Sequence, residues 1–178
     1  ISKTIYLKSN KGISVVRNIG ILECKDSEYI SFLDSDDCID IKFINECFKK
    51  IKSLGDNMFV GSYEILNELG RKEKYNHFKM DKLLNRENKE LLNYLNLYLL
   101  QPNRYSLFSY CWGRIYSMKI INENLLKFNE KMHTFEDVDF NFRYLFFTKE
   151  IYFVNTNSYT QYLDKKNLLE KKLNFWKK

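Results

Sequence analysis

The chain has 178 residues, a length that suits one domain with its own hydrophobic core, so we expect a single domain over residues 1–178. Hydrophobic residues make up 44% of the chain and aromatic residues 16%, which excludes a disordered polypeptide. The formal net charge is +6, yet the lysines are interleaved with acidic residues, as on a solvated surface. We therefore expect no nucleic-acid partner.

The cysteines predict neither a metal knuckle nor a disulfide framework, because no C-x-x-C pair occurs among Cys24, Cys38, Cys47 and Cys111. This favours a reduced, cytoplasmic setting. No apolar run approaches the roughly 20 residues that span a bilayer. The chain begins with Ile1 rather than Met, which suggests that an upstream segment is missing.

The first half of the chain alternates between strand and helix patterns. Thr4–Leu7 is β-branched and aromatic, which predicts a short strand. After Gly12, Ser14 is a candidate N-cap for a helix running to about Lys25. The apolar run Tyr29–Leu33 predicts a strand buried on both faces. Further elements are a helix capped by Asp40 and ending before Gly55, and a strand over Met58–Leu66.

The second half continues with less regular patterns. The expected elements are a polar excursion or hairpin arm over Gly70–Phe78, a helix over Glu87–Leu100 stopped by Pro102, an aromatic segment Tyr105–Tyr116, a short helix Met118–Glu123, a helix from Glu136, strands Ile151–Val154 and Ser158–Tyr162, and a final helix over 164–178. This order predicts an α/β fold with a mostly parallel sheet and helices on both faces. Ligands of such sheets bind beyond the carboxyl ends of the strands.

The sharpest motif is an acidic turn at such a strand end, Asp34-Ser35-Asp36-Asp37. Carboxylates this close repel one another unless a cation compensates them, and Mg²⁺ is commonly held by one or two carboxylates plus phosphate oxygens. An EF-hand beginning at Asp34 fails at its glycine and glutamate positions, and a match to aspartyl-phosphate phosphatases is poor. The structural alternative is a polar turn in which Asp37 or Asp40 caps the next helix.

A second acidic pair, Glu136-Asp137, opens a predicted helix about a hundred residues downstream. A carboxylate there can accept the proton of an incoming hydroxyl group, which is general-base catalysis. The alternative is a capping box, since Thr134-x-x-Asp137 fits that pattern and helix dipoles favour acids in the first turn.

Two weaker motifs carry cationic or aromatic groups. Asn10-x-Gly12 leads into a helix whose first turns carry Arg17, and amides with a guanidinium suit an anionic nucleotide. Trp112 and Arg114 are candidates to line a sugar or diphosphate pocket. The plain alternatives are a solvent-facing Arg17 and a core Trp112.

Taken together, these motifs resemble a family 2 glycosyltransferase of the GT-A fold, of the type that builds bacterial capsule, lipopolysaccharide or other surface polysaccharide. The order of Asn10, Arg17, the acidic turn, Trp112-x-Arg114 and Glu136-Asp137 carries the resemblance. It implies a nucleotide-sugar donor, most simply a UDP-sugar, a glycan or lipid-linked acceptor, and inversion at the anomeric carbon. The family's opening, nucleotide-recognising strands have no counterpart here, so we expect an incomplete fold and weak or no turnover.

The resemblance also implies individual roles. Asp36 would bind Mn²⁺ or Mg²⁺ directly, with Asp34 near the metal or the ribose, while Asn10, Arg17, Trp112 and Arg114 would contact the donor. Asp137 would be the catalytic base, and Glu136 would position the acceptor.

Two rival functions and one peripheral feature stay open. The rivals are a catalytically inactive glycosyltransferase remnant that binds nucleotide or glycan, and a two-metal nuclease, which would need a further acidic set. Residues 164–178 place apolar residues among lysines, as in a basic amphipathic helix. Such a helix either docks on the domain or touches the inner face of the cell membrane.

Overall fold

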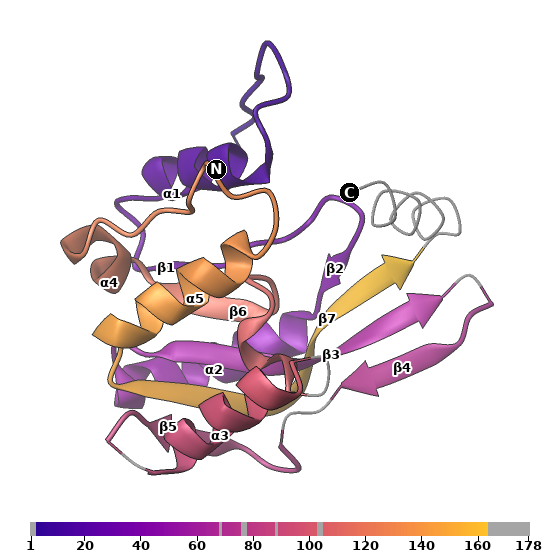
Figure 1. The fold of residues 1–178 in the computed structure, drawn as a ribbon, viewed down its shortest axis with the longest axis vertical. Coiled ribbons are helices and arrows are strands. Elements are labelled where there is room, and N and C mark those ends of the chain that lie inside the picture. Colours follow the sequence, from indigo (N-terminus) through magenta and orange to yellow (C-terminus); the bar gives the residue numbers. More distant parts are fainter. Residues whose placement is uncertain (1–2, 68, 76–77, 88, 103–104, 164–178) are drawn as a thin grey trace.

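The computed structural model describes residues 3–67, 69–75, 78–87, 89–102 and 105–163, and these form a sheet with helices packed against it (Figure 1). The helices are α1 (Ile13–Glu23), α2 (Ile41–Leu54), α3 (Lys89–Leu100), α4 (Met118–Glu123) and α5 (Glu136–Phe147), with a 3₁₀ turn, η1 (Ser106–Phe108). The strands are β1 (Tyr29–Ile30), β2 (Cys38–Ile39), β3 (Met58–Asn67), β4 (Lys72–Tyr75), β5 (Lys82–Asn85), β6 (Arg114–Ser117) and β7 (Glu150–Leu163). None of the described helices is both long and apolar enough to cross a membrane.

The sheet is built around two long strands, β3 and β7, which run parallel to each other. Its order is β1-β6-β3-β7-β2, with β4 also paired to β3 and β5 to β7. The expectation of a mostly parallel sheet is wrong for the described residues, because every strand pair other than β3–β7 is antiparallel. Parallel neighbours need a long crossover, usually a helix, whereas β4 follows β3 after a short turn at Gly70.

Helices cover both faces of the sheet, as expected, and a separate hydrophobic core lies on each face (Figure 1). Successive strand residues point to opposite faces. Met58 and Val60 of β3 therefore enter the larger core together with side chains of α3 and α5, including Tyr144. Phe59 enters a smaller core on the other face, where it packs with Phe43 of α2.

Most predicted elements are present, but one early strand is absent and one predicted helix cap is wrong. Asp40 caps α2 by accepting the Lys42 N–H at 2.8 Å, and Gly55 ends that helix at φ 70°. Residues 4–7 form no strand, because no neighbouring strand supplies ladder hydrogen bonds there. Ser14 lies inside α1 rather than at its cap, since Gly12, at φ 84°, already turns the chain into the helix.

The later strands also differ from expectation. The two predicted strands 151–154 and 158–162 are one strand, β7, with register shifts opposite Gly61 and Ser62. The short strand β5 was not predicted, and it pairs with the start of β7. The predicted basic helix over 164–178 lies outside the described residues.

Candidate active site

The acidic turn leaves the core directly after the buried residue Phe32. That ring packs edge-on against Phe128 and Phe140, with centroid distances of 5.3 and 6.1 Å, and its backbone bridges to Trp112. Leu33, the next residue, is already exposed. The turn is therefore anchored by an aromatic side chain, and Asp34 lies at the boundary between core and solvent.

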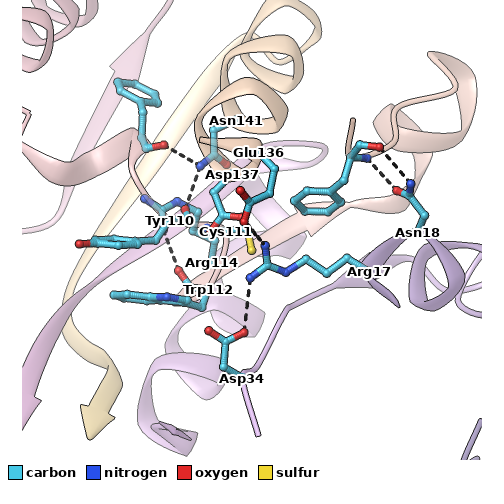
Figure 2. Close-up of polar contacts among 12 residues, drawn as sticks. Arg17, Asn18, Asp34, Tyr110, Cys111, Trp112, Arg114, Glu136, Asp137 and Asn141 are labelled. Atoms are coloured by element: carbon cyan, nitrogen blue, oxygen red, sulfur yellow. Dashed lines mark hydrogen bonds and ion pairs between the residues drawn. The ribbon is translucent and has the colours of Figure 1, made fainter. Parts of the chain in front are cut away.

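Arg17 of α1 joins the two acidic segments (Figure 2). One guanidinium nitrogen pairs with Asp137 and lies 3.5 Å from Glu136, while the other lies 3.4 Å from Asp34. The Arg17 side chain is 8% exposed and its guanidinium also sits over the Phe128 ring. Segments about a hundred residues apart thus meet at one buried cation.

Asp137 is held at both of its oxygens. Oδ1 accepts from Arg17 and Oδ2 accepts the Cys111 N–H at 3.0 Å, and the residue is buried. It stands in the first turn of α5, after Phe135, whose backbone is left-handed at φ 63°. Because a carboxylate offers about four lone-pair positions, two donors leave room for a third hydrogen bond.

The Cys111 amide is itself positioned by Asn141, a residue that was not predicted from the sequence to belong to the site. Asn141 lies one helical turn after Asp137 and is fully buried. Its Nδ2 donates to the carbonyls of Phe108 and Tyr110 at 2.9 and 2.8 Å, and its Oδ1 accepts from a tyrosine hydroxyl at 2.6 Å. The i,i+4 spacing from Asp137 to Asn141 was the available signal, because it places both side chains on one helix face.

A cleft of about 820 Å³ lies between α1 and the acidic turn. This volume is within the range of ligand sites. The polar and charged groups that line it include Asn10, Arg17, Asp34, Ser35 and Asp36. The Asn10 side chain accepts the Gly12 N–H at 2.9 Å, so part of its hydrogen-bonding capacity already shapes the turn before α1.

The two acids of the cleft have different surroundings. Burial raises the pKa of Asp34 above its ordinary value, although Arg17 acts in the opposite direction. Asp36 is exposed and accepts no hydrogen bond within the described part of the chain. The described residues contain no cluster of three or more His, Cys, Asp or Glu suited to a metal ion. The carboxylates of Asp34 and Asp36 are nonetheless the donor type that Mg²⁺ or Mn²⁺ takes alongside phosphate oxygens.

Trp112 and Arg114 lie in the core rather than on the cleft, which corrects the expectation that they line a ligand pocket. Trp112 is stacked between Tyr110 and Tyr159, with ring centroids 4.3 and 4.2 Å away. Arg114 is 2% exposed and donates to the backbone carbonyls of Trp112 and Leu107. A buried guanidinium needs such acceptors, so these two residues shape the segment that carries Cys111.

Solved structures share this architecture. Staphylococcus aureus TarS, residues 1–349 in complex with UDP, matches with a TM-score of 0.67 at 17% identity, over 92% of this chain and 44% of that chain. The same protein in complex with UDP-GlcNAc matches with a TM-score of 0.68 at 18% identity, over 89% of this chain and 41% of that chain. The fold is therefore the GT-A fold of glycosyltransferases.

The sequence comparison defines the family. The model described as "Glycosyl transferase family 2" matches residues 2–124, more than half of the chain. This chain belongs to glycosyl transferase family 2. It is also 27% identical over 122 residues to "Glycosyltransferase GlyA" of Streptococcus pneumoniae serotype 4 (strain ATCC BAA-334 / TIGR4), over 68% of this chain and 17% of that protein. The chain thus spans less than half the length of each of these relatives.

Proposed function

We propose that this domain is an inverting, metal-dependent glycosyltransferase that moves a sugar from a nucleotide-diphosphate sugar to an acceptor hydroxyl. The supporting observation is the shared contact of Arg17 with both acidic segments. Through this contact the acidic turn and the candidate base share one guanidinium. The solved structures of TarS with UDP and with UDP-GlcNAc support a UDP-sugar as the donor.

In the proposed reaction, Asp36 and Asp34, which line the cleft, would hold Mn²⁺ or Mg²⁺. A bound ion of this kind neutralises the charge of a departing diphosphate. Arg17 faces the same cleft, so an entering diphosphate competes with Asp34 and Asp137 for its guanidinium.

Asp137 takes the proton of the acceptor hydroxyl as the acceptor oxygen bonds to the anomeric carbon. The bond from that carbon to the diphosphate oxygen breaks, and its electron pair leaves with the diphosphate. Glu136, partly buried beside Arg17, is the residue that we propose contacts the acceptor. A single displacement of this kind inverts the anomeric centre.

The biological setting proposed here is the synthesis of a bacterial surface polysaccharide on a glycan or lipid-linked acceptor. The four cysteines are free thiols in the structure, which fits the proposed cytoplasmic location. The membrane contact proposed for the segment 164–178 concerns residues outside the described part of the chain.

Calorimetry of the full chain with UDP and Mn²⁺ tests the donor site. We expect binding that requires Mn²⁺ and that Asp36→Ala abolishes, while Asp26→Ala, an exposed acid outside the cleft, leaves it unchanged. Equal affinity with and without the metal would contradict metal dependence.

The catalytic proposal needs a second measurement, because the rival of an inactive nucleotide-binding remnant predicts the same calorimetry. Release of UDP from UDP-GlcNAc, with and without acceptor glycans, gives a rate for the chain, which we expect to be low because the family's opening strands have no counterpart in it. Asp137→Asn should lower this rate about 10²- to 10⁴-fold while UDP binding persists. Binding without any turnover in the unsubstituted protein would favour the remnant.

A further inference from the structure

The third carboxylate of the acidic turn has a different environment from the other two. Asp37 faces away from the cleft and toward β7, where its Oδ2 accepts from the Tyr159 hydroxyl at 2.7 Å. Its Oδ1 accepts the backbone N–H of Tyr162 at 2.9 Å. Each oxygen of Asp37 is therefore already bonded within the protein.

The Tyr159 hydroxyl reaches the turn at two points. It donates to Asp37 and accepts the backbone N–H of Asp34 at 3.2 Å. A tyrosine hydroxyl can donate one hydrogen bond and accept another, so both contacts form at once. One side chain on β7 thus fixes both ends of the acidic turn.

The ring that carries this hydroxyl is firmly held. Tyr159 is fully buried and stacks on Trp112 at an interplanar angle of 11°. The chain after the turn is attached to the same strand, since Ile39 of β2 pairs with Tyr159 and the Asp40 N–H donates to the Ser158 carbonyl at 2.9 Å. The end of β7 is therefore a rigid support against which residues 34–40 are folded.

We propose that Tyr159 and Asp37 are positioning residues for the nucleotide-diphosphate and metal site, and that Asp37 is not a ligand of the metal. The proposal rests on the proposed function, and it separates the three acids into two ligands and one anchor. Sites of this kind need their groups held within about half an ångström, which requires supporting residues that are themselves locked. Tyr159 meets that requirement, because its ring is stacked and its hydroxyl is bonded twice.

Tyr159→Phe removes the hydroxyl and keeps the stacked ring. Tyr152→Phe is a matched control, because Tyr152 lies on the same strand and its hydroxyl also bonds a carboxylate, that of Asp81 at 3.1 Å. Losing a supporting hydrogen bond at a metal site typically lowers metal affinity 10- to 100-fold. In calorimetry with Mn²⁺ and UDP we expect about a tenfold loss or more for Tyr159→Phe and no loss for Tyr152→Phe.

Asp37→Asn distinguishes an anchor from a ligand. If Asp37 acts through Tyr159, Asp37→Asn and the double variant Asp37→Asn/Tyr159→Phe should bind Mn²⁺ and UDP as weakly as Tyr159→Phe alone. If Asp37 is a ligand, Asp37→Asn should weaken the binding of Mn²⁺ and UDP far more than Tyr159→Phe does. The double variant Asp37→Asn/Tyr159→Phe should then bind more weakly than either single variant. The second result would overturn the proposal.

Amide hydrogen exchange tests the anchor without any ligand. Exchange at residues 34–37 should be faster in Tyr159→Phe than in the unsubstituted chain and unchanged in Tyr152→Phe. Unchanged exchange in Tyr159→Phe would refute the positioning role. If the exchange result holds and the unsubstituted protein binds neither UDP nor Mn²⁺, the proposed function fails while the support of the turn by Tyr159 stands, and the role toward a metal site is rejected.

Discussion

Arg17 is the residue whose removal should disturb the site most, because it pairs with the buried Asp137 on one side and the partly exposed Asp34 on the other. In Arg17→Met a chain of similar length fills the space without a charge. Asp137, with its side chain 12% exposed, then loses its cation, and a buried ion pair that loses one partner costs about 3–5 kcal/mol. The loss of the Arg17 contact with Asp34 contributes less to the destabilisation, because the Asp34 side chain is 31% exposed and water screens its charge. We therefore expect Arg17→Met to lower the free energy of unfolding by about 3–5 kcal/mol at neutral pH.

Urea unfolding measures this loss, with Arg143→Met as the control. Arg143 pairs with Asp139 on α5, where the two side chains are 36% and 29% exposed, and such surface pairs contribute about 0–1 kcal/mol. The double variant Arg17→Met/Asp137→Asn should recover part of the stability, because no unpaired buried anion remains. A loss for Arg17→Met no larger than that for Arg143→Met would refute the interpretation of Arg17 as a buried clamp.

The pH dependence gives an independent check on the same variant. Burial raises the pKa of Asp34 and Arg17 lowers it, so removing Arg17 should raise that pKa further. A carboxyl whose folded-state pKa exceeds its unfolded value binds protons more readily when folded, and the folded state gains stability as pH falls through that pKa. The free energy of unfolding of Arg17→Met should therefore lie closer to that of the unsubstituted chain at about pH 5 than at neutral pH. A deficit that grows on acidification would contradict this.

Three further substitutions test the supports of the site. Asn141→Leu leaves buried carbonyls of the 108–111 segment unpaired, so we expect a loss of about 3 kcal/mol in urea unfolding, and a loss below about 1 kcal/mol would contradict that role. Gly113→Ala places a Cβ at φ 65° only 2.7 Å from a serine oxygen of β7 and should cost about 2 kcal/mol or more in thermal unfolding. Gly12→Ala, at φ 84° with no atom within 4 Å of the added Cβ, should cost less, about 1 kcal/mol.

The parts of the fold that follow local rules could be predicted from the sequence. The boundaries of α2 follow from Asp40 and Gly55, because a capping side chain and a residue at positive φ act on their own helix. The acidic turn at the end of a buried run was likewise visible in the chain. The direction of strand pairing was not, because it depends on which strands meet after the chain has reversed at β4.

In the site, too, motifs of neighbouring residues could be predicted, whereas contacts between distant residues could not. The motifs at Asp34 and Asp137 were identified from residue type and spacing. The bonds from Tyr159 to Asp37 and from Cys111 to Asp137 were not, since each joins residues far apart in the sequence. The capping alternative for Asp37 also failed for this reason, because the α2 cap is Asp40 and the Asp37 carboxylate is bonded to β7.

The charge balance of the site argues for a cation in the proposed reaction. Asp34 and Asp36 line the cleft together with Arg17, and Arg17 contacts Asp34, Glu136 and Asp137, so the site carries four carboxylates and one guanidinium. A nucleotide diphosphate is itself an anion and would raise the excess of negative charge if it entered alone. Coulomb repulsion at a few ångströms amounts to several kcal/mol in a partly buried site. We therefore propose that the donor binds together with a divalent ion, and we expect removal of that ion to release it.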